Sequence, residues 1–186
     1  HLDYHKSYKD YLNSKLILFK YLMKKNAKIL FNNDIEQSRL LKKICAEKKI
    51  KSLTIGKNDS DLKLLDHKYI GHKQKVTFSY KNKIYYFETN LIGKIQINNL
   101  FMAILAALES KIQFKKIISC VNKIKSINGR MEEVGKIKNN SKVILDYAHT
   151  PNALKTAILD IKEEFPLSKI SLVFGCGGNR DKDKRP

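Results

Sequence analysis

Hydrophobic positions in the first part of the chain follow two different patterns. Between residues 6 and 24 they recur every three or four positions, which predicts a helix with one apolar stripe. The stripe is formed by Tyr8, Tyr11, Leu12, Leu16 and Phe19. The short apolar runs Lys28–Phe31 and Ser52–Ile55 predict strands, and the turn Asn32-Asn33-Asp34 is expected to cap a helix over residues 35–48. Strands that alternate with helices indicate an α/β fold.

The middle of the chain carries the pattern of a hairpin followed by two helices. Val76–Tyr80 and Ile84–Phe87 are rich in β-branched and aromatic residues, and the polar turn Lys81-Asn82-Lys83 separates them. Apolar residues at helical spacing then predict helices over residues 96–109 and 114–126.

A second region begins where the helical pattern stops. Asn128-Gly129 is typical of a turn, and we place a domain boundary there. Val143–Leu145 and Ile170–Phe174 predict buried strands, and between them Thr150 can cap, and Pro151 can open, a helix. The apolar face of that helix comprises Leu154, Ile158, Ile161 and Phe165. A strand–helix–strand unit predicts a parallel sheet at the start of a Rossmann-like domain.

The large excess of positive charge widens the range of functions to consider. The 186 residues carry a formal net charge of +19, and a basic surface can attract nucleic acid. However, all but four of the 37 basic residues are lysine, and they are spread along the whole chain. Reading of bases and bidentate binding of phosphate favour arginine. We therefore interpret the charge as a consequence of a general enrichment in lysine, and we expect no nucleic-acid partner.

Hydrophobicity and cysteine content indicate a cytoplasmic globular protein. Hydrophobic residues make up 42% of the chain, which is enough for a core. No apolar run is long enough to cross a bilayer and no signal-peptide pattern opens the chain, so no membrane association is expected. Cys45, Cys120 and Cys176 are too widely spaced to indicate a disulfide framework or a zinc site. Because the first residue is His1, we expect an internal piece of a longer protein.

Lys15 is the first candidate for chemistry. It lies within the apolar stripe, one turn from Tyr11 and Phe19, where partial loss of hydration would favour the neutral amine. A neutral amine can react with carbon dioxide to give a carbamate, whose oxygens suit Mg²⁺. The alternative, which periodicity alone favours, is a lysine whose stem covers apolar surface while its ammonium group reaches water. His1 and His5 form a weaker candidate for metal binding.

Two loops that follow predicted strands are further candidates. The segment from Asp146 to Pro151 lies where a strand ends and a helix begins, which is where α/β sheets bind ligands. Asp146 can accept hydrogen bonds from a ribose or can tie the loop, and the sequence favours neither. Gly175–Gly178 precedes a basic segment with Arg180, whose guanidinium could hold a carboxylate or belong to a solvated turn.

Five stretches together resemble the Mur ligase family, especially its diaminopimelate-adding members. They occur in the family's order and spacing over essentially the whole chain. The stretches are HLDYH (1–5), YLNSKLILF (11–19), GRME (129–132), DYAHTPNAL (146–154) and FGCGGNRDKDKRP (174–186). The resemblance implies that residues 1–127 are the later part of a P-loop-type central ATPase domain. Residues 128–186 would be the start of a Rossmann-like C-terminal domain.

The resemblance also implies a reaction and its participants. Members of the family are ATP-dependent ligases of peptidoglycan synthesis, in which ATP phosphorylates a carboxylate and an amine attacks the acyl phosphate, with Mg²⁺ neutralising charge. The implied substrates are a UDP-N-acetylmuramoyl dipeptide and meso-diaminopimelate, and a monomer is expected. Alternatives are a lysine-adding ligase, a folylpolyglutamate or cyanophycin synthetase, or a non-catalytic basic binding module.

Site residues carried over from the resemblance fall into three groups. His1 and Lys15 match metal-binding positions, and Lys15 matches the family's carbamylated, catalytic lysine. Arg180 matches the arginine that holds the carboxylate of the incoming diamino acid. The residues that match nucleotide-binding positions are Asn99, Arg130, Asp146 and His149.

The chain departs from the family pattern at several positions and lacks three of its parts. Gln96 stands where asparagine is usual, Ile95 replaces a phenylalanine, Asn179 an aspartate and Asp183 a glycine. The UDP-binding domain, a GTNGKT-type phosphate loop and a DNPR motif do not occur in the 186 residues. We therefore expect the isolated chain to be inactive and the full protein to be a ligase.

Overall fold

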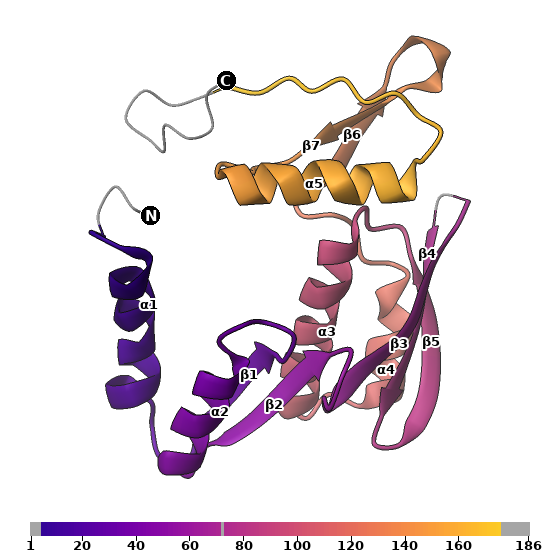
Figure 1. Cartoon of the computed structure of the whole chain (residues 1–186). Coiled ribbons are helices and arrows are strands. Elements are labelled where there is room, and N and C mark those ends of the chain that lie inside the picture. Colours follow the sequence, from indigo (N-terminus) through magenta and orange to yellow (C-terminus); the bar gives the residue numbers. More distant parts are fainter. Residues whose placement is uncertain (1–4, 72, 176–186) are drawn as a thin grey trace.

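The structure consists of two units that follow one another along the chain (Figure 1). This computed structural model describes residues 5–71 and 73–175. Its α-helices are α1 (Tyr8–Ile17), α2 (Ser38–Glu47), α3 (Lys94–Glu109), α4 (Phe114–Val121) and α5 (Pro151–Glu164). Its strands are β1 (Lys28–Asn32), β2 (Lys51–Gly56), β3 (Leu62–Ile70), β4 (Lys73–Tyr80), β5 (Lys83–Thr89), β6 (Glu132–Lys136) and β7 (Lys142–Leu145).

A five-stranded sheet forms the centre of the first unit. Its strands lie in the order β1-β2-β3-β4-β5, with β2 parallel to β1 and β3 and the remaining pairs antiparallel. Helices α3 and α4 pack on one face of it (Figure 1). Phe78 on β4 and Phe101 on α3 are buried against each other, with ring centroids 5.4 Å apart. Burial of such side chains stabilises the unit, and the predicted α/β class is confirmed.

The predicted hairpin is present and longer than expected. Strands β4 and β5 are joined by Lys81 and Asn82, whose φ angles of 50° and 60° are both left-handed, as a two-residue hairpin turn requires. Strand β3 was not predicted, although it pairs with β4 along its length. Charged side chains such as Lys63, Asp66 and Lys68 interrupt the alternation by which a strand is identified.

The first two helices differ from the predicted ones at their ends. Helix α1 continues as a π-helical turn (Leu18–Leu22), and Leu16 is the one buried residue of the expected stripe. Helix α2 begins at Ser38, and Gln37 before it contributes no side-chain cap. The expected cap is wrong, because Asn32 Oδ1 instead accepts a hydrogen bond from the nearby Asp34 N–H (2.8 Å).

The second unit contains the antiparallel pair β6–β7 and helix α5. Thr150 Oγ1 accepts a hydrogen bond from the Ala153 N–H (3.2 Å) and Pro151 occupies the first turn, so the predicted start of α5 is confirmed. The four apolar residues predicted to share a face are half-buried.

The parallel strand–helix–strand arrangement predicted for this unit is wrong for the described residues. Ile170–Phe174 forms no strand, and the side chains of Leu172, Val173 and Phe174 are exposed. Strand β7, expected to be buried, is partly exposed and pairs only with the antiparallel β6 among the residues described. An apolar run becomes a buried strand only where a neighbouring strand bonds to it and another layer covers it. Among residues 5–71 and 73–175, no strand bonds to this run and no layer covers it.

Candidate functional site

The four candidate nucleotide-binding residues come from three segments near the start of α3. Asn99 is on α3, Arg130 precedes β6, and Asp146 and His149 lie between β7 and α5. Gln96 connects the first two: Asn99 Nδ2 donates to Gln96 Oε1 (3.2 Å), and Gln96 Nε2 donates to the Arg130 carbonyl (3.0 Å). Gln96 is buried, whereas Asn99 and Arg130 are exposed. The contact chain therefore links the two units and leaves both outer side chains accessible.

Arg130 continues this chain into a row of planar groups. Its guanidinium carbon lies 5.3 Å from the centroid of the Tyr147 ring, a cation–π contact. The Tyr147 and His149 rings follow, with centroids 5.3 Å apart. Arg130 and Tyr147 are exposed and His149 is half-buried. Planar faces with hydrogen-bonding edges suit the stacking of an aromatic base and the binding of a phosphate.

Hydrogen bonds within the second unit give the GRME segment its shape. Gly129 is left-handed (φ 69°), its N–H donates to Glu132 Oε2 (2.7 Å), and its carbonyl accepts from the Tyr147 N–H (2.8 Å). Asp146 Oδ2 accepts from the Met131 N–H (3.0 Å). These bonds hold the segment against the loop after β7, so the position of Arg130 depends on both.

Asp146 is used to tie the loop in which it lies. Besides the Met131 N–H, it accepts a hydrogen bond from the Ala148 N–H through Oδ1 (2.8 Å). Both carboxylate oxygens therefore have backbone partners, which matches the second of the two roles considered from sequence. A contact between Asp146 and a ribose stays a prediction.

Lys15 lies elsewhere, on α1, which stands apart from α5 and the β6–β7 pair in Figure 1. The premise that Lys15 loses hydration within the apolar stripe is wrong, since its side chain is exposed. Its Nζ lies 4.7 Å from the centroid of the Tyr11 ring, a cation–π contact. The other two candidates, His1 and Arg180, lie outside the described residues.

A complete metal site is not assembled in the part of the chain that the structure describes. No group of three or more His, Cys, Asp or Glu side chains could hold a metal ion there. The amine of Lys15 is not itself a ligand for Mg²⁺, which prefers oxygen. Carbamylation of Lys15 therefore stays a prediction.

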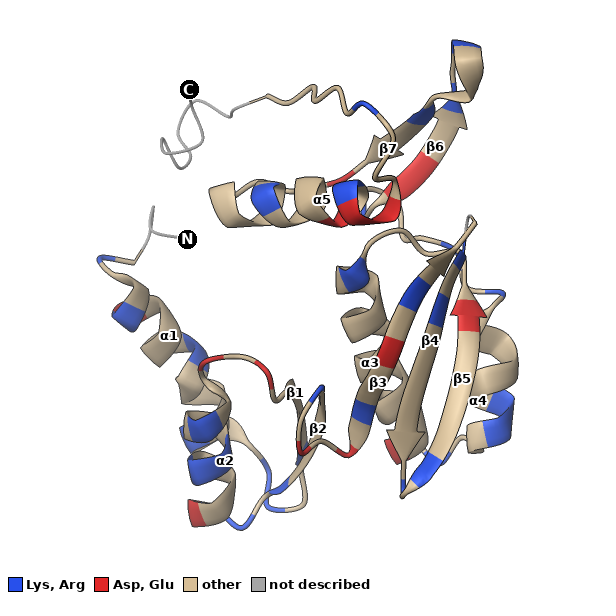
Figure 2. Ribbon diagram, turned by 45° about the vertical axis from the view of Figure 1, so that its right-hand side comes forward, with Lys and Arg blue, Asp and Glu red and all other residues tan. Residues whose placement is uncertain are grey.

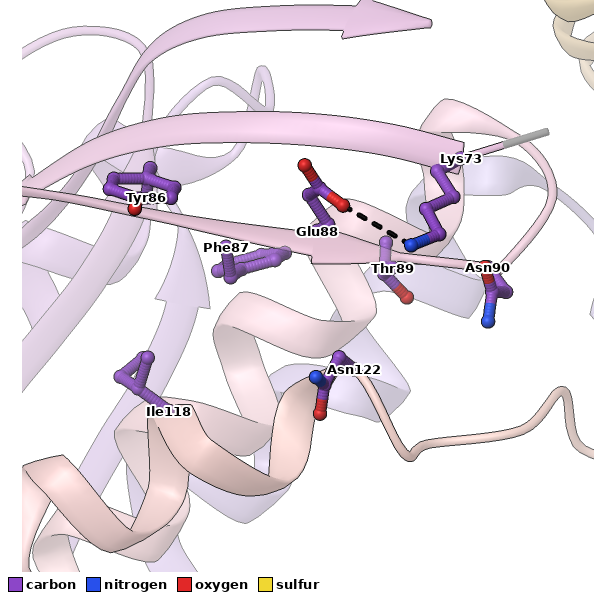
Figure 3. A pocket seen from close by; sticks show the side chains of 8 residues that line it. All are labelled: Lys73, Tyr86, Phe87, Glu88, Thr89, Asn90, Ile118 and Asn122. Carbon is purple, nitrogen blue, oxygen red and sulfur yellow. Dashed lines mark hydrogen bonds and ion pairs between the residues drawn. The ribbon is translucent and has the colours of Figure 1, made fainter. Parts of the chain in front are cut away.

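Two pockets in the first unit contain none of the described candidates. The one in Figure 3 has a volume of about 330 Å³ and lies between β5 and α4, with Ile118 and Asn122 contributed by α4. An ion pair between Lys73 Nζ and Glu88 Oε2 (3.3 Å) lies at its edge. A second pocket of about 390 Å³ lies beside β3. Asn99 and Arg130 of the candidate nucleotide site are instead exposed.

Basic residues are distributed over both units rather than gathered on one element. Figure 2 shows Lys and Arg positions on α1, α2, α4 and α5 and on the strands of the large sheet. None of the helices in residues 5–71 and 73–175 is long and apolar enough to cross a membrane.

Sequence reasoning missed two residues that organise the site. In the sequence Gln96 is only a departure from the family pattern, although in the structure it joins Asn99 to Arg130. Tyr147 lies inside the DYAH stretch and forms the ring on which Arg130 rests. The position of Tyr147 in the sequence, between the candidates Asp146 and His149, is the signal from which its role in the site could have been predicted.

The fold and this cluster define a two-unit α/β protein with a polar surface shared by the units. Residues 1–107 match the profile of the Mur ligase middle domain, and residues 129–186 match that of the Mur ligase glutamate ligase domain. The chain belongs to the Mur ligase family, as its motifs predicted.

Relatives of known sequence make the likeness more specific. The UDP-N-acetylmuramoyl-L-alanyl-D-glutamate--2,6-diaminopimelate ligase of Rickettsia bellii (strain RML369-C) is 38% identical over the whole chain. The ligase of the same name from Agrobacterium fabrum (strain C58 / ATCC 33970) is 32% identical, also over the whole chain. The chain spans 38% of the length of each relative.

Solved structures agree with this likeness. A structure of a UDP-N-acetylmuramoyl-L-alanyl-D-glutamate--2,6-diaminopimelate ligase superposes with a TM-score of 0.70 at 27% identity, covering 100% of this chain and 38% of its own. The MurF ligase from Thermotoga maritima, in complex with ADP, has a TM-score of 0.74 at 19% identity and covers 88% of this chain and 36% of its own. The second likeness concerns the fold alone.

Proposed function

We propose that this chain is part of an ATP-dependent ligase of cell-wall precursor synthesis. The enzyme joins 2,6-diaminopimelate, through an amide bond, to the D-glutamyl carboxylate of UDP-N-acetylmuramoyl-L-alanyl-D-glutamate. The whole-chain match to relatives of that name supports the substrate class. The structural observation that carries the proposal is the contact chain from Asn99 through Gln96 to Arg130, because a nucleotide bound there would touch both units.

The proposed reaction has two steps. The terminal phosphoryl group of ATP passes to the substrate carboxylate, which gives an acyl phosphate and ADP. The amino group of diaminopimelate then attacks the acyl carbon, phosphate leaves with the electrons of the broken C–O bond, and the amine proton goes to solvent. Because no bond to the protein forms, the contribution of the chain is positioning and neutralisation of charge.

Different residues of the shared surface would bind different parts of the nucleotide. Arg130, resting on Tyr147, offers N–H donors to phosphate or to a base edge, and the Asn99 amide can donate and accept at an adenine. His149 adds a ring beside Tyr147. Asp146 supports Arg130 through the loop rather than through the reacting atoms.

Magnesium would supply Lewis-acid neutralisation of phosphate charge when it is bound. We propose that Lys15, once carbamylated, offers the ion an oxygen ligand and that His1 is a second ligand. The Lys15→Arg variant keeps the positive charge but cannot form a carbamate, and we expect it to reduce ligation about 100-fold. Lys9→Arg, an exposed position on the same helix, is the matched control and should stay within about twofold of the parent. Equal activity of the two variants would refute the role of Lys15.

The central experiment uses the full-length protein encoded by the gene that contains these residues. It is supplied with ATP, the UDP-linked dipeptide and either diaminopimelate, lysine or ornithine, and both ADP and the ligated product are measured. We expect product with diaminopimelate, and none from residues 1–186 alone. Incorporation of lysine alone would refute the proposed acceptor, and ligation of a folate substrate instead would refute the proposed enzyme. Binding of polyanions without any ATP turnover would support a non-catalytic module.

The choice of diamino acid rests on Arg180 as well as on the relatives. Arg180→Lys, which replaces a planar fork by a point charge, should raise KM for diaminopimelate about tenfold and leave KM for ATP unchanged. Arg185→Lys, five residues later, is the matched control. A cytoplasmic monomer is proposed with the reaction, and light scattering of the full-length protein tests the oligomeric state.

A further inference from the structure

The start of α3 is completed by side chains from the other unit. Helix α3 begins after Gly93, which has no side chain with which to cap it. The Ile95 N–H donates to Asp160 Oδ2 (3.0 Å), and the Gly93 N–H donates to Glu164 Oε2 (2.8 Å). Both carboxylates are on α5. We call these two carboxylates and the two N–H groups the interunit cap.

The interunit cap is buried, although it consists of charged groups. Asp160 and Glu164 are each 7% exposed and are the buried residues of α5, whose apolar side chains are half-buried or exposed. Burial of a carboxylate is unfavourable unless hydrogen bonds compensate it. The N–H bonds and the positive end of the α3 dipole provide part of that compensation. Docking of α5 on α3 therefore depends on these contacts more than on apolar area.

Two more observations locate the same contact. Lys94 Nζ and Glu163 Oε1 form an ion pair (3.6 Å) at its edge. At Gly93 (φ 85°), a Cβ atom would lie 3.0 Å from Asp160 Oδ2 and 3.1 Å from Met131 Cε. Three segments thus approach one glycine: the start of α3, helix α5 and the GRME stretch. Figure 1 shows α5 lying across the end of α3, and Figure 2 shows acidic positions in the part of α5 above it.

The interunit cap and the candidate nucleotide site share their supports. Met131, whose side chain lies against Gly93, follows Arg130 directly. Gln96, in the first turn of α3, holds the Arg130 carbonyl. A movement of α5 away from α3 would release this turn from the second unit. Arg130 and Asn99 would then no longer be held as neighbours.

We propose that Asp160 and Glu164 are positioning residues for the nucleotide: they dock α5 on the start of α3 and thereby hold Arg130 beside Asn99. The inference rests on the proposed function, because it assigns these carboxylates to the nucleotide site of that enzyme. They touch neither the substrate nor the reacting atoms. Their effect passes through the relative placement of the two units.

The first test measures placement and needs no activity. Spin labels are attached to Cys120, exposed on α4, and to a cysteine at Lys138→Cys in the second unit of the full-length protein, with other reactive cysteines replaced by serine. We expect one narrow distance distribution for the parent and a broad one for the Asp160→Ala/Glu164→Ala variant. The Asp160→Asn/Glu164→Gln variant keeps acceptor oxygens and should give an intermediate width. Coincident distributions for all three would overturn the proposal.

The second test measures the consequence for the nucleotide. For Asp160→Ala/Glu164→Ala we expect KM for ATP to rise about tenfold, with a smaller change in kcat, and the amide variant to recover part of the loss. Lys155→Ala, at an exposed position of α5 outside the interunit cap, is the control and should change KM less than twofold. Unchanged KM for ATP in a folded double variant would overturn the proposal. If the parent shows no ligation at all, the proposed function fails. The distance measurement still tests whether the interunit cap fixes the relative placement of the two units.

Discussion

Helices α3 and α5 begin in opposite ways. At the start of α5, Thr150 accepts a hydrogen bond from an N–H three residues further on, so the cap is local. At the start of α3, Gly93 offers no side chain, and the N–H groups are bound by Asp160 and Glu164. A local cap stabilises one helix wherever that helix lies. A cap from another unit also fixes where that unit lies, so the two kinds of cap should respond differently to substitution.

The largest effect is expected from Gly93→Ala, which disturbs the start of α3 itself. The left-handed φ of 85° and the close Asp160 Oδ2 and Met131 Cε atoms should together lower the free energy of unfolding by about 2–4 kcal/mol. Urea denaturation of the full-length protein measures this. Gly129→Ala is the matched control, because Gly129 is also left-handed (φ 69°) but has no atom within 4 Å of its Cβ position, so we expect about 1–2 kcal/mol. Equal losses would mean that close packing at Gly93 contributes nothing.

The two caps also differ in how far they could be predicted. Thr150 and the helix that it caps are adjacent in sequence, so the start of α5 could be predicted from residue types alone. Asp160 and Glu164 are 65 and 71 residues from the N–H groups that they bind, and their spacing on α5 gives no indication of a partner. The grouping of Asn99 with Arg130 was likewise implied only by resemblance to a family.

The incorrect predictions have the same physical origin. The stripe on α1 was predicted from periodicity, but periodicity does not say how much surface covers a helix, and Lys15 is exposed. Ile170–Phe174 has the composition of a strand, yet a strand needs a bonded neighbour that composition does not reveal. Local chemistry is readable from sequence, whereas the identity of a distant partner is not.

The next largest effect is expected from removing the local cap of α5. Thr150→Ala removes the acceptor for the Ala153 N–H and should lower the free energy of unfolding by about 1 kcal/mol. The distance between the labels at Cys120 and Lys138→Cys should not change, because the hydrogen bond of the local cap lies within the start of α5. Thr156→Ala, in the interior of the same helix, removes only a bond to the Asn152 carbonyl and should be neutral. A broadened distance distribution in Thr150→Ala would remove the distinction between the two caps.

A smaller effect should appear in the pH dependence of stability. Burial raises the pKa of Asp160 and of Glu164 above their ordinary values, although N–H bonds from Ile95 and Gly93 and the charges of Lys94 and Lys142 oppose it. Glu163 and Glu133 add to the increase. Since the folded-state pKa is the higher one, the folded state binds protons more tightly than the unfolded state. The associated stabilisation is complete below the ordinary carboxyl pKa and is lost as pH rises through the raised values.

Urea denaturation from about pH 4 to pH 8 tests this sign. The free energy of unfolding of the parent should decline with rising pH relative to Asp160→Asn/Glu164→Gln, whose amides do not titrate. The Thr150→Ala variant should follow the parent, because its cap is uncharged. Parallel curves for the parent and the amide variant would show that the two carboxylates titrate alike in the folded and unfolded states.

The smallest effect concerns Tyr69 at the end of β3, beside the interunit cap. Burial raises the pKa of its hydroxyl, and the charges of Glu164, Glu163 and Asp160 raise it further. Among the residues described, the buried Tyr69 hydroxyl has no hydrogen-bond partner. Because an unsatisfied buried hydroxyl opposes folding, Tyr69→Phe should leave stability unchanged or increase it by up to about 1 kcal/mol.

Tyr86→Phe, whose parent ring is 67% exposed on β5, provides the control and should have no effect. Thermal unfolding of the two variants at neutral pH compares them directly. A destabilised Tyr69→Phe would mean that the hydroxyl donates to a carboxylate of the interunit cap in solution. The cap would then extend from α5 to β3, and the contrast with the local cap of α5 would become larger rather than smaller.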